Sequence, residues 1–183
     1  MNSSVFEPRD ILSFWFDKAG PQRWFKKSAD FDALCRERFL PTLDAASRGE
    51  CWHWRNTPPG RCAEIIVLDQ ISRNIFRDDA RAFAQDPMAL VLAQEAVACG
   101  DDLRMTADER YFTYMPYMHS ESLRVHDEAL RLFEALGKEQ PLRYEIMHRD
   151  IIARFGRYPG RNEALGRTST EAELDHLKEH GGF

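Results

Sequence analysis

The chain has 183 residues, 43% of them hydrophobic, so it can bury a core of its own and is expected to form one domain over residues 1–183. The net charge of −5 argues against nucleic-acid binding, and the longest aliphatic run, IIVL at 65–68, is far too short to cross a membrane. Four cysteines without a C-x-x-C pair, and an N-terminus unlike a signal peptide, predict reduced thiols in a cytoplasmic protein.

Helix signals begin close to the N-terminus. Pro8 suits the first turn of a helix through DILSFWF, because a proline there gives up only an N–H that has no partner within the helix. Ser28 can cap a second helix, in which apolar residues recur every three or four positions until Gly49 ends it. A kink is expected within this helix at Pro41.

Two further helices are predicted in the middle of the chain. Thr57 marks the start of the third and Asp86 the start of the fourth, each followed by a proline, and the fourth should stop near Gly100. The four aliphatic residues at 65–68 cover every direction around the third helix. This helix should therefore be central and buried.

The second half of the chain adds four helices. A capping box at 106–109 begins the fifth, which Pro116 should break, and the next two are expected over about 120–137 and about 141–155. A second capping box, at 170–173, begins the last helix. About eight helices joined by short links predict an all-α fold, built as an antiparallel helical array.

Polar side chains follow the aliphatic run of the third helix. Asp69 places a carboxylate in this segment, and a stripe with the spacing i, i+3, i+4 and i+7 consists of Gln70, Arg73, Asn74 and Arg77. A buried polar stripe is costly unless every group has a partner, so it either ties the fold together or lines a pocket. We expect Asp69 to form hydrogen bonds with one of Arg73, Arg154, Arg157 and Arg161.

The turn in MPYMHSESL carries polar residues where one helix ends and the next begins. His119 and Glu121 can act together as acid and base or bind a metal, and Ser120 can bind a ligand or simply cap the helix. The metal-binding motif H-E-x-x-H is absent and H-x-E is not followed by P-C-x-x-C, so no metal and no cofactor is predicted. His148 shares a helix face with apolar residues, so it is either a hydrogen-bonded core histidine or a pocket histidine.

The segment IIARFGRYPGRNEALGR at 151–167 concentrates arginines in an otherwise acidic chain. Residues 143–167 hold six arginines against three acidic residues, a local charge of +3. Gly156 is placed to end a helix in a left-handed turn, Pro159 fixes the bend that follows, and Asn162 can cap a short helix. This punctuation is typical of a compact loop that holds guanidinium groups in a fixed arrangement for an anion, although it has no P-loop motif.

Eight motifs occur in order along about 11–177: ILSFWF, RWF, FD, LDQISRNIFR, AFAQD, YMPYMHSE, RFGRYPGRN and LGRTST. In these motifs the chain resembles the bacterial domain of unknown function 924 family. The resemblance implies an all-α fold similar to tetratricopeptide-repeat superhelices, and it implies no activity. Ser72 stands where the family usually has proline, and Gly160 where a bulkier residue is common, which bears on stiffness more than on charge. The implied signature positions are Asp69, Gln70, Arg73, Asn74, Arg77, His119, Ser120, Glu121, Arg154, Arg157, Arg161 and Asn162.

Three functions are compatible with these residues. The first is a pocket for a small anionic ligand, phosphorylated or carboxylated, where the third helix, the turn at 119–121 and the arginine loop meet. There His119 would be the acid or base and Glu121 would orient it. Asp69 and His148 would support the ligand-binding residues, which are Gln70, Arg73, Asn74, Arg77, Ser120, Arg154, Arg157, Arg161 and Asn162. The second is a scaffold whose concave helical face binds a peptide, and the third is a structural salt-bridge network.

Overall fold

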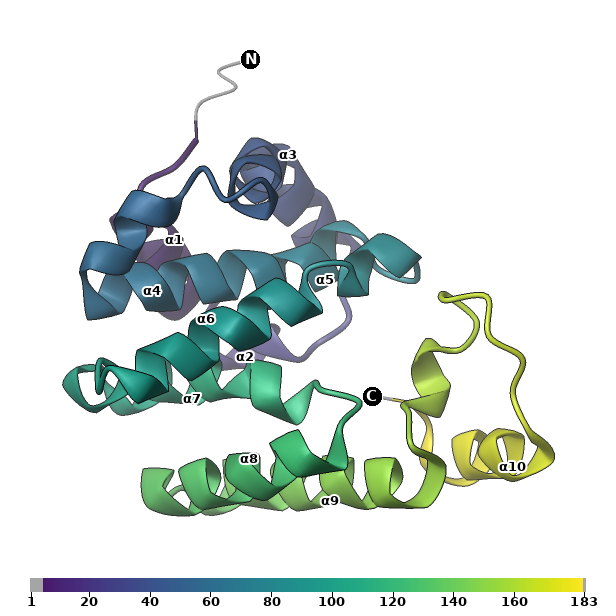
Figure 1. Ribbon diagram of the computed structural model, residues 1–183. Coiled ribbons are helices and arrows are strands. Elements are labelled where there is room, and N and C mark those ends of the chain that lie inside the picture. Colours follow the sequence, from purple (N-terminus) through teal and green to yellow (C-terminus); the bar gives the residue numbers. More distant parts are fainter. Residues whose placement is uncertain (1–4, 183) are drawn as a thin grey trace. The chain divides into compact units, whose positions relative to one another are not determined.

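The computed structural model describes residues 5–182, and every regular element in this range is a helix (Figure 1). Helices make up 75% of the structure, which confirms the predicted all-α class. The described residues form two compact units. The first contains the described residues up to Arg77 together with Arg81–Pro116, and the second contains Asp78–Ala80 together with the described residues from Tyr117 onward. The single domain over 1–183 and the likeness to a tetratricopeptide-repeat superhelix stay predictions.

The first unit is built around one long helical segment, residues 58–75. The helices of this unit are α1 (Pro8–Leu12), α2 (Pro21–Trp24), α3 (Ala29–Ser47), α4 (Pro58–Ile65), α5 (Ser72–Ile75), α6 (Asp86–Ala98) and, as far as Pro116, α7 (Ala107–Met118). A wider π-helical turn, Ile66–Ile71, joins α4 to α5 without a break, and all side chains from 62 to 72 are buried. Since the segment packs against α1, α3 and α6, the predicted central, buried helix is confirmed.

Shorter elements complete the first unit. A second π-helical turn, Ser13–Ala19, continues α1, so the helix predicted through DILSFWF is present with wider turns. The remaining elements are short 3-10 turns at Trp52–Asn56, Ala80–Phe83 and Asp102–Arg104, of which Ala80–Phe83 crosses from one unit to the other.

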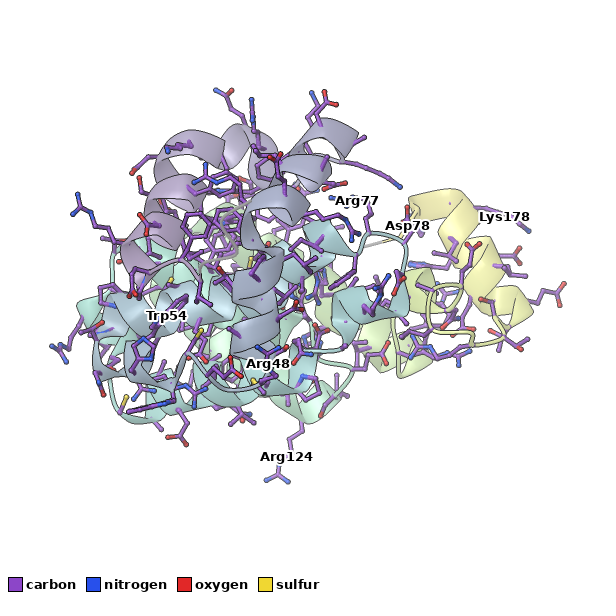
Figure 2. All side chains as sticks on the ribbon, turned by 90° about the horizontal axis from the view of Figure 1, so that it is seen from above. Arg48, Trp54, Arg77, Asp78, Arg124 and Lys178 are labelled. Atoms are coloured by element: carbon purple, nitrogen blue, oxygen red, sulfur yellow. The ribbon has the colours of Figure 1, made fainter. Side chains whose placement is uncertain are left out.

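One of these short turns is anchored by an ion pair between a partly exposed arginine and a buried carboxylate. The guanidinium of Arg55, next to Trp54 (labelled in Figure 2), donates from Nε and Nη2 to the two carboxylate oxygens of Glu64 at 2.8 and 2.7 Å. The Glu64 side chain is 0% exposed and lies on α4. The pair therefore ties the turn at Trp52–Asn56 to the central segment.

The second unit contains an antiparallel helical hairpin. Its helices α8 (Leu123–Leu136) and α9 (Glu139–Phe155) lie side by side, joined by a two-residue link (Figure 1). Gly137 and Gly156 end them with φ of 70° and 71°, and Gly156 thereby forms the left-handed turn predicted for it. A 3-10 turn at Pro159–Arg161 follows, and then α10 (Glu171–His180).

Predicted helix starts that depend on local capping are confirmed. The Ser28 hydroxyl accepts a hydrogen bond from the backbone N–H of Phe31, and the Thr57 hydroxyl accepts one from Gly60. The capping box at 170–173 is present, because the Thr170 and Glu173 side chains each accept from the other's backbone N–H.

Three predicted boundaries near prolines and polar residues are corrected. Pro116 does not break α7, because it lies in the last turn and the helix goes on to Met118. Ser122 rather than Ser120 precedes α8, and Pro141 lies in the first turn of α9, where its missing N–H would have no partner within the helix. Asn162 does not begin a helix; it follows the turn at Pro159–Arg161, and its side chain serves other contacts.

Candidate functional site

The polar stripe of the first unit begins with a buried carboxylate. Asp69 is 0% exposed, and Arg73 Nη1 lies 3.1 Å from its Oδ1 and donates to its backbone oxygen at 2.6 Å. The same guanidinium forms a two-pronged pair with Asp86 at 2.8 and 2.9 Å, and Gln70 Nε2 donates to Asp69 Oδ2. The predicted contact between Asp69 and an arginine is therefore confirmed.

The other half of the stripe meets an acid of α3. Arg77 (labelled in Figure 2) donates to both oxygens of Asp32 at 2.5 and 2.7 Å, and Asn74 Nδ2 donates to the same carboxylate at 2.8 Å. Burial opposes the charge of Asp32, but the hydrogen bonds from Arg77 and Asn74 outweigh it and hold its pKa below the usual value. The stripe thus ties α3 and α6 to the central segment, as the structural-network hypothesis expects.

In the second unit, side chains hold the backbone of residues 118–121, at the end of α7, through hydrogen bonds. We call this segment the 118–121 corner. Three successive backbone carbonyls of this corner each accept a hydrogen bond from a side chain. Tyr158 Oη donates to the carbonyl of residue 118 at 2.5 Å, Arg161 Nη2 to that of His119 at 2.9 Å, and His126 Nε2 to that of Ser120 at 2.9 Å. The backbone that carries His119 is therefore fixed at three consecutive points.

The carboxylate of the corner, Glu121, forms hydrogen bonds with the arginine loop, residues 151–167. Glu121 accepts a hydrogen bond from the backbone N–H of Tyr158 at 2.8 Å and a two-pronged pair from Arg167 at 2.7 and 2.9 Å. Burial would raise the pKa of Glu121, but Arg167 and the Tyr158 N–H outweigh it and lower the pKa. Glu121 stays ionised and fastens the loop to the corner.

Arg157 and Asn162 connect the loop to α10. Arg157 donates from Nε and Nη2 to the two oxygens of Glu173 at 2.6 and 2.8 Å, and Asn162 Nδ2 donates to Ser169 Oγ at 3.0 Å and to Glu173 Oε2 at 3.4 Å. The hydrogen bonds from Arg157, together with those from Thr170, lower the pKa of Glu173 to about 2. From the sequence, Glu173 was predicted only as part of a capping box, so its ion pair with Arg157 was not predicted.

Replacing Arg157 with alanine is expected to lower the melting midpoint by several degrees, because it strands Glu173, whose side chain is almost fully buried. This reverses the expectation for a ligand-binding arginine, whose removal would leave the ligand-free protein unchanged. The parent protein should be more stable than the variant above pH 4.5, and this difference should vanish as the pH falls towards 2. The reason is that pairing with Arg157 lowers the folded-state pKa of Glu173. Thermal melts of both proteins between pH 7 and pH 2.5 check this. Equal midpoints at pH 7 would contradict it.

His148 is a buried histidine that also lies beside the corner. Its Nδ1 is 2.7 Å from the carbonyl oxygen of Tyr144, so Nδ1 carries the hydrogen of the neutral ring. Burial lowers the pKa of His148 to about 3. Its ring centre lies 6.4 Å from that of His119 and 5.6 Å from that of Tyr158, and the Arg161 guanidinium lies over the Tyr158 ring at 4.5 Å. His148 is therefore a hydrogen-bonded core histidine, and its role in a pocket stays a prediction.

A second buried histidine was missed by sequence reasoning. His126 Nδ1 lies 2.7 Å from Glu145 Oε1, and both side chains are 0% exposed. The signal was available, because His126 shares the i, i+3, i+7 stripe of α8 with Ala129 and Phe133, and Glu145 shares that of α9 with His148. Polar residues inside such stripes are the ones to pair.

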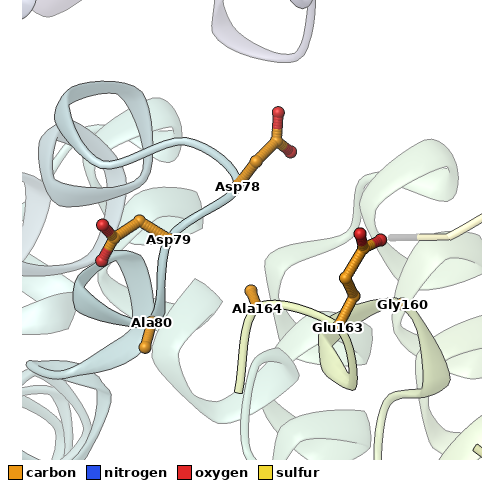
Figure 3. Close-up of a pocket in the computed structure, with 6 residues that line it drawn as sticks. All are labelled: Asp78, Asp79, Ala80, Gly160, Glu163 and Ala164. Carbon is orange, nitrogen blue, oxygen red and sulfur yellow. The ribbon is translucent and has the colours of Figure 1, made fainter. Parts of the chain in front are cut away.

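The remaining features give no support to an arginine-lined pocket. Arg154 is exposed and lies over the Phe155 ring at 4.7 Å. A hollow of about 720 Å³ in the second unit has an acidic lining (Figure 3), made of Asp78, Asp79, Ala80, Gly160, Glu163 and Ala164. Among the described residues, no group of three or more histidine, cysteine, aspartate or glutamate side chains could hold a metal.

The predicted site residues are divided between the two units. Asp69, Gln70, Arg73, Asn74 and Arg77 lie in the first. The second contains the others, which are His119, Ser120, Glu121, His148, Arg154, Arg157, Arg161 and Asn162. A single pocket formed by both groups stays a prediction. Over residues 5–182, the structure contains no helix long and apolar enough to cross a membrane.

Comparison with known proteins places these features in a family. The family described as "Bacterial protein of unknown function (DUF924)" matches residues 11–181. The solved structure of a protein of unknown function from Agrobacterium tumefaciens is 39% identical, with a TM-score of 0.89, and the alignment covers 94% of this chain and 97% of that one. No curated protein matches the chain significantly.

Proposed function

The chain belongs to the DUF924 family of bacterial proteins, and from its geometry we propose that it binds a small phosphorylated or carboxylated molecule at the 118–121 corner, with His119 as the acid or base. The observation that carries the proposal is the fixing of three successive corner carbonyls by side chains. A functional group gains most from a backbone that is held in one orientation before the ligand arrives. His119 is a titratable side chain on that backbone, and the other one, Glu121, is paired with Arg167.

A positive charge lies close to His119, and the negative charge of Glu121 in the same corner is paired with Arg167. Arg161 is buried, keeps its positive charge at all ordinary pH values, and holds the His119 carbonyl. His148 is neutral at pH 7 because of its lowered pKa, and its ring is the next one to His119. A permanent cation and a neutral imidazole beside a histidine form a set that can bind a negative group and exchange a proton with it.

Fewer residues are assigned to the ligand here than the sequence predicts. Arg73, Arg77 and Arg157 are paired with carboxylates, so we assign them to the structural network rather than to the ligand. We assign Arg161 and His119 to the ligand because the Arg161 guanidinium donates to the His119 carbonyl, and His148, whose ring lies beside that of His119, supports them. Peptide binding stays the alternative prediction.

The test is a series of thermal melts with phosphate, sulfate, sugar phosphates, nucleotides and dicarboxylates. A ligand at 100 times its dissociation constant adds about 2.7 kcal/mol, which raises the melting midpoint by several degrees. His119→Asn should abolish this rise while the fold stays intact. Arg143→Ala, which removes an exposed arginine of α9, is the matched control and should keep it. The imidazole signals of His119 in NMR spectra should shift on the same titration. If no anion moves either the midpoint or these signals, the proposal is wrong.

A further inference from the structure

The hydrogen bonds around His126 determine where its protons are. Nε2 lies 2.9 Å from the Ser120 carbonyl oxygen, which can only accept, so Nε2 carries a hydrogen. The other neighbour of Nε2 is the Tyr158 hydroxyl at 3.1 Å, which gives its own hydrogen to the Met118 carbonyl and can accept here as well. Nδ1 faces Glu145 Oε1 at 2.7 Å, and a proton must lie between these two atoms, since otherwise two lone pairs would meet.

That proton belongs to one of the two partners. Either an imidazolium faces a carboxylate, or a neutral imidazole accepts from a carboxylic acid. Both side chains are fully buried, and the second oxygen of Glu145, Oε2, is buried with no hydrogen-bond partner among residues 5–182. An ionised oxygen without a donor costs far more in the interior than the carbonyl oxygen of a neutral acid. Burial raises the pKa of Glu145 by more than its hydrogen bond with His126 and the charge of Arg149 lower it, which agrees with the neutral form.

We propose that Glu145 is protonated and donates to a neutral His126, and that this uncharged pair is a positioning device that fixes the Ser120 carbonyl and thereby orients His119. The inference rests on, and deepens, the anion site proposed at His119. Glu145 and His126 act through the backbone of the corner, because His126 bonds to the carbonyl directly after His119. With Tyr158 and Arg161 on the two preceding carbonyls, the pair completes the set of three.

The protonation state can be measured in the ligand-free protein. Imidazole ¹⁵N NMR at pH 7 should show His126 as a neutral ring with its hydrogen on Nε2. An imidazolium, with both nitrogens protonated, would overturn the proposal. This measurement needs neither a ligand nor a variant.

The positioning role is tested by two substitutions at one site. Glu145→Gln keeps a donor towards His126 Nδ1. Its melting midpoint, the NMR signals of His119 and the phosphate concentration at half-saturation should therefore stay close to those of the parent protein. Glu145→Ala removes the donor, so the His119 signals should move and phosphate binding should weaken by about tenfold.

Three results would overturn the positioning role. The first is that Glu145→Gln changes the His119 signals and phosphate binding as much as Glu145→Ala does. The second is that Glu145→Ala folds and leaves the His119 signals unchanged. The third is that Glu145→Ala binds phosphate as the parent protein does. If phosphate does not bind the parent at all, the proposed function fails for that ligand, and the His126 tautomer and the His119 signals still decide the role of the pair.

Discussion

Acidifying the protein below pH 6.5 is expected to lower its free energy of unfolding, by up to about 1.4 kcal/mol per pH unit, through His148 alone. The reason is burial, which lowers the folded-state pKa of His148 from 6.5 to about 3. Between these two values the unfolded chain binds a proton at His148 and the folded chain does not. The contribution of His148 to stability is therefore greatest above pH 6.5 and falls as the pH decreases.

The measurement is chemical denaturation at several pH values between 7 and 5, where the acidic residues contribute least. His148→Gln, which cannot titrate, should flatten the dependence by about the stated slope. Arg143→Gln introduces the same residue at an exposed position of the same helix and should leave the slope unchanged. Parallel curves for the parent protein and His148→Gln would show that the imidazole is not buried in its neutral form.

Replacing Arg55 with methionine is expected to destabilise the protein by about 3–5 kcal/mol, because the buried carboxylate of Glu64 loses its partner. Removing both charges, as in Arg55→Met with Glu64→Leu, should recover most of this loss, since no buried charge is then left unpaired. The measurement is again chemical denaturation at pH 7.

A matched control for Arg55 lies on the surface. Arg48 (labelled in Figure 2) forms a similar two-pronged pair with Glu50, but the side chains are 60% and 54% exposed. Arg48→Met should therefore change stability little, because water replaces the lost contact. Similar losses for Arg55→Met and Arg48→Met would show that burial of Glu64 does not govern the effect.

The features that were predicted correctly depend on neighbours in the chain. Ser28, Thr57 and Gly156 act within a few residues of themselves, so caps and left-handed turns can be recognised locally. The central helix was also recognised, because four aliphatic residues in a row leave no polar face. The π-helical turn at Ile66–Ile71 was not, because a spacing rule of 3.6 residues assumes a regular helix throughout.

The partners of the polar residues were mostly missed. Arg77 and Arg157 were singled out as ligand-binding residues, but their carboxylates, Asp32 and Glu173, lie 45 and 16 positions away in the chain. Residue type and spacing identify a costly group without identifying what compensates it. Of the four arginines predicted as possible partners of Asp69, the one that contacts it is Arg73, which lies one helical turn away in the chain.

Because of the division into two units, tryptophan fluorescence is an intrinsic probe of the first unit. All four tryptophans, at positions 15, 24, 52 and 54, belong to the first unit. Tryptophan emission therefore reports unfolding of that unit, whereas helical ellipticity reports both. Coincident transitions would mean that the units unfold cooperatively as one domain, and separate transitions that they do not. An anion bound at the 118–121 corner would then raise the emission midpoint only in a cooperative protein.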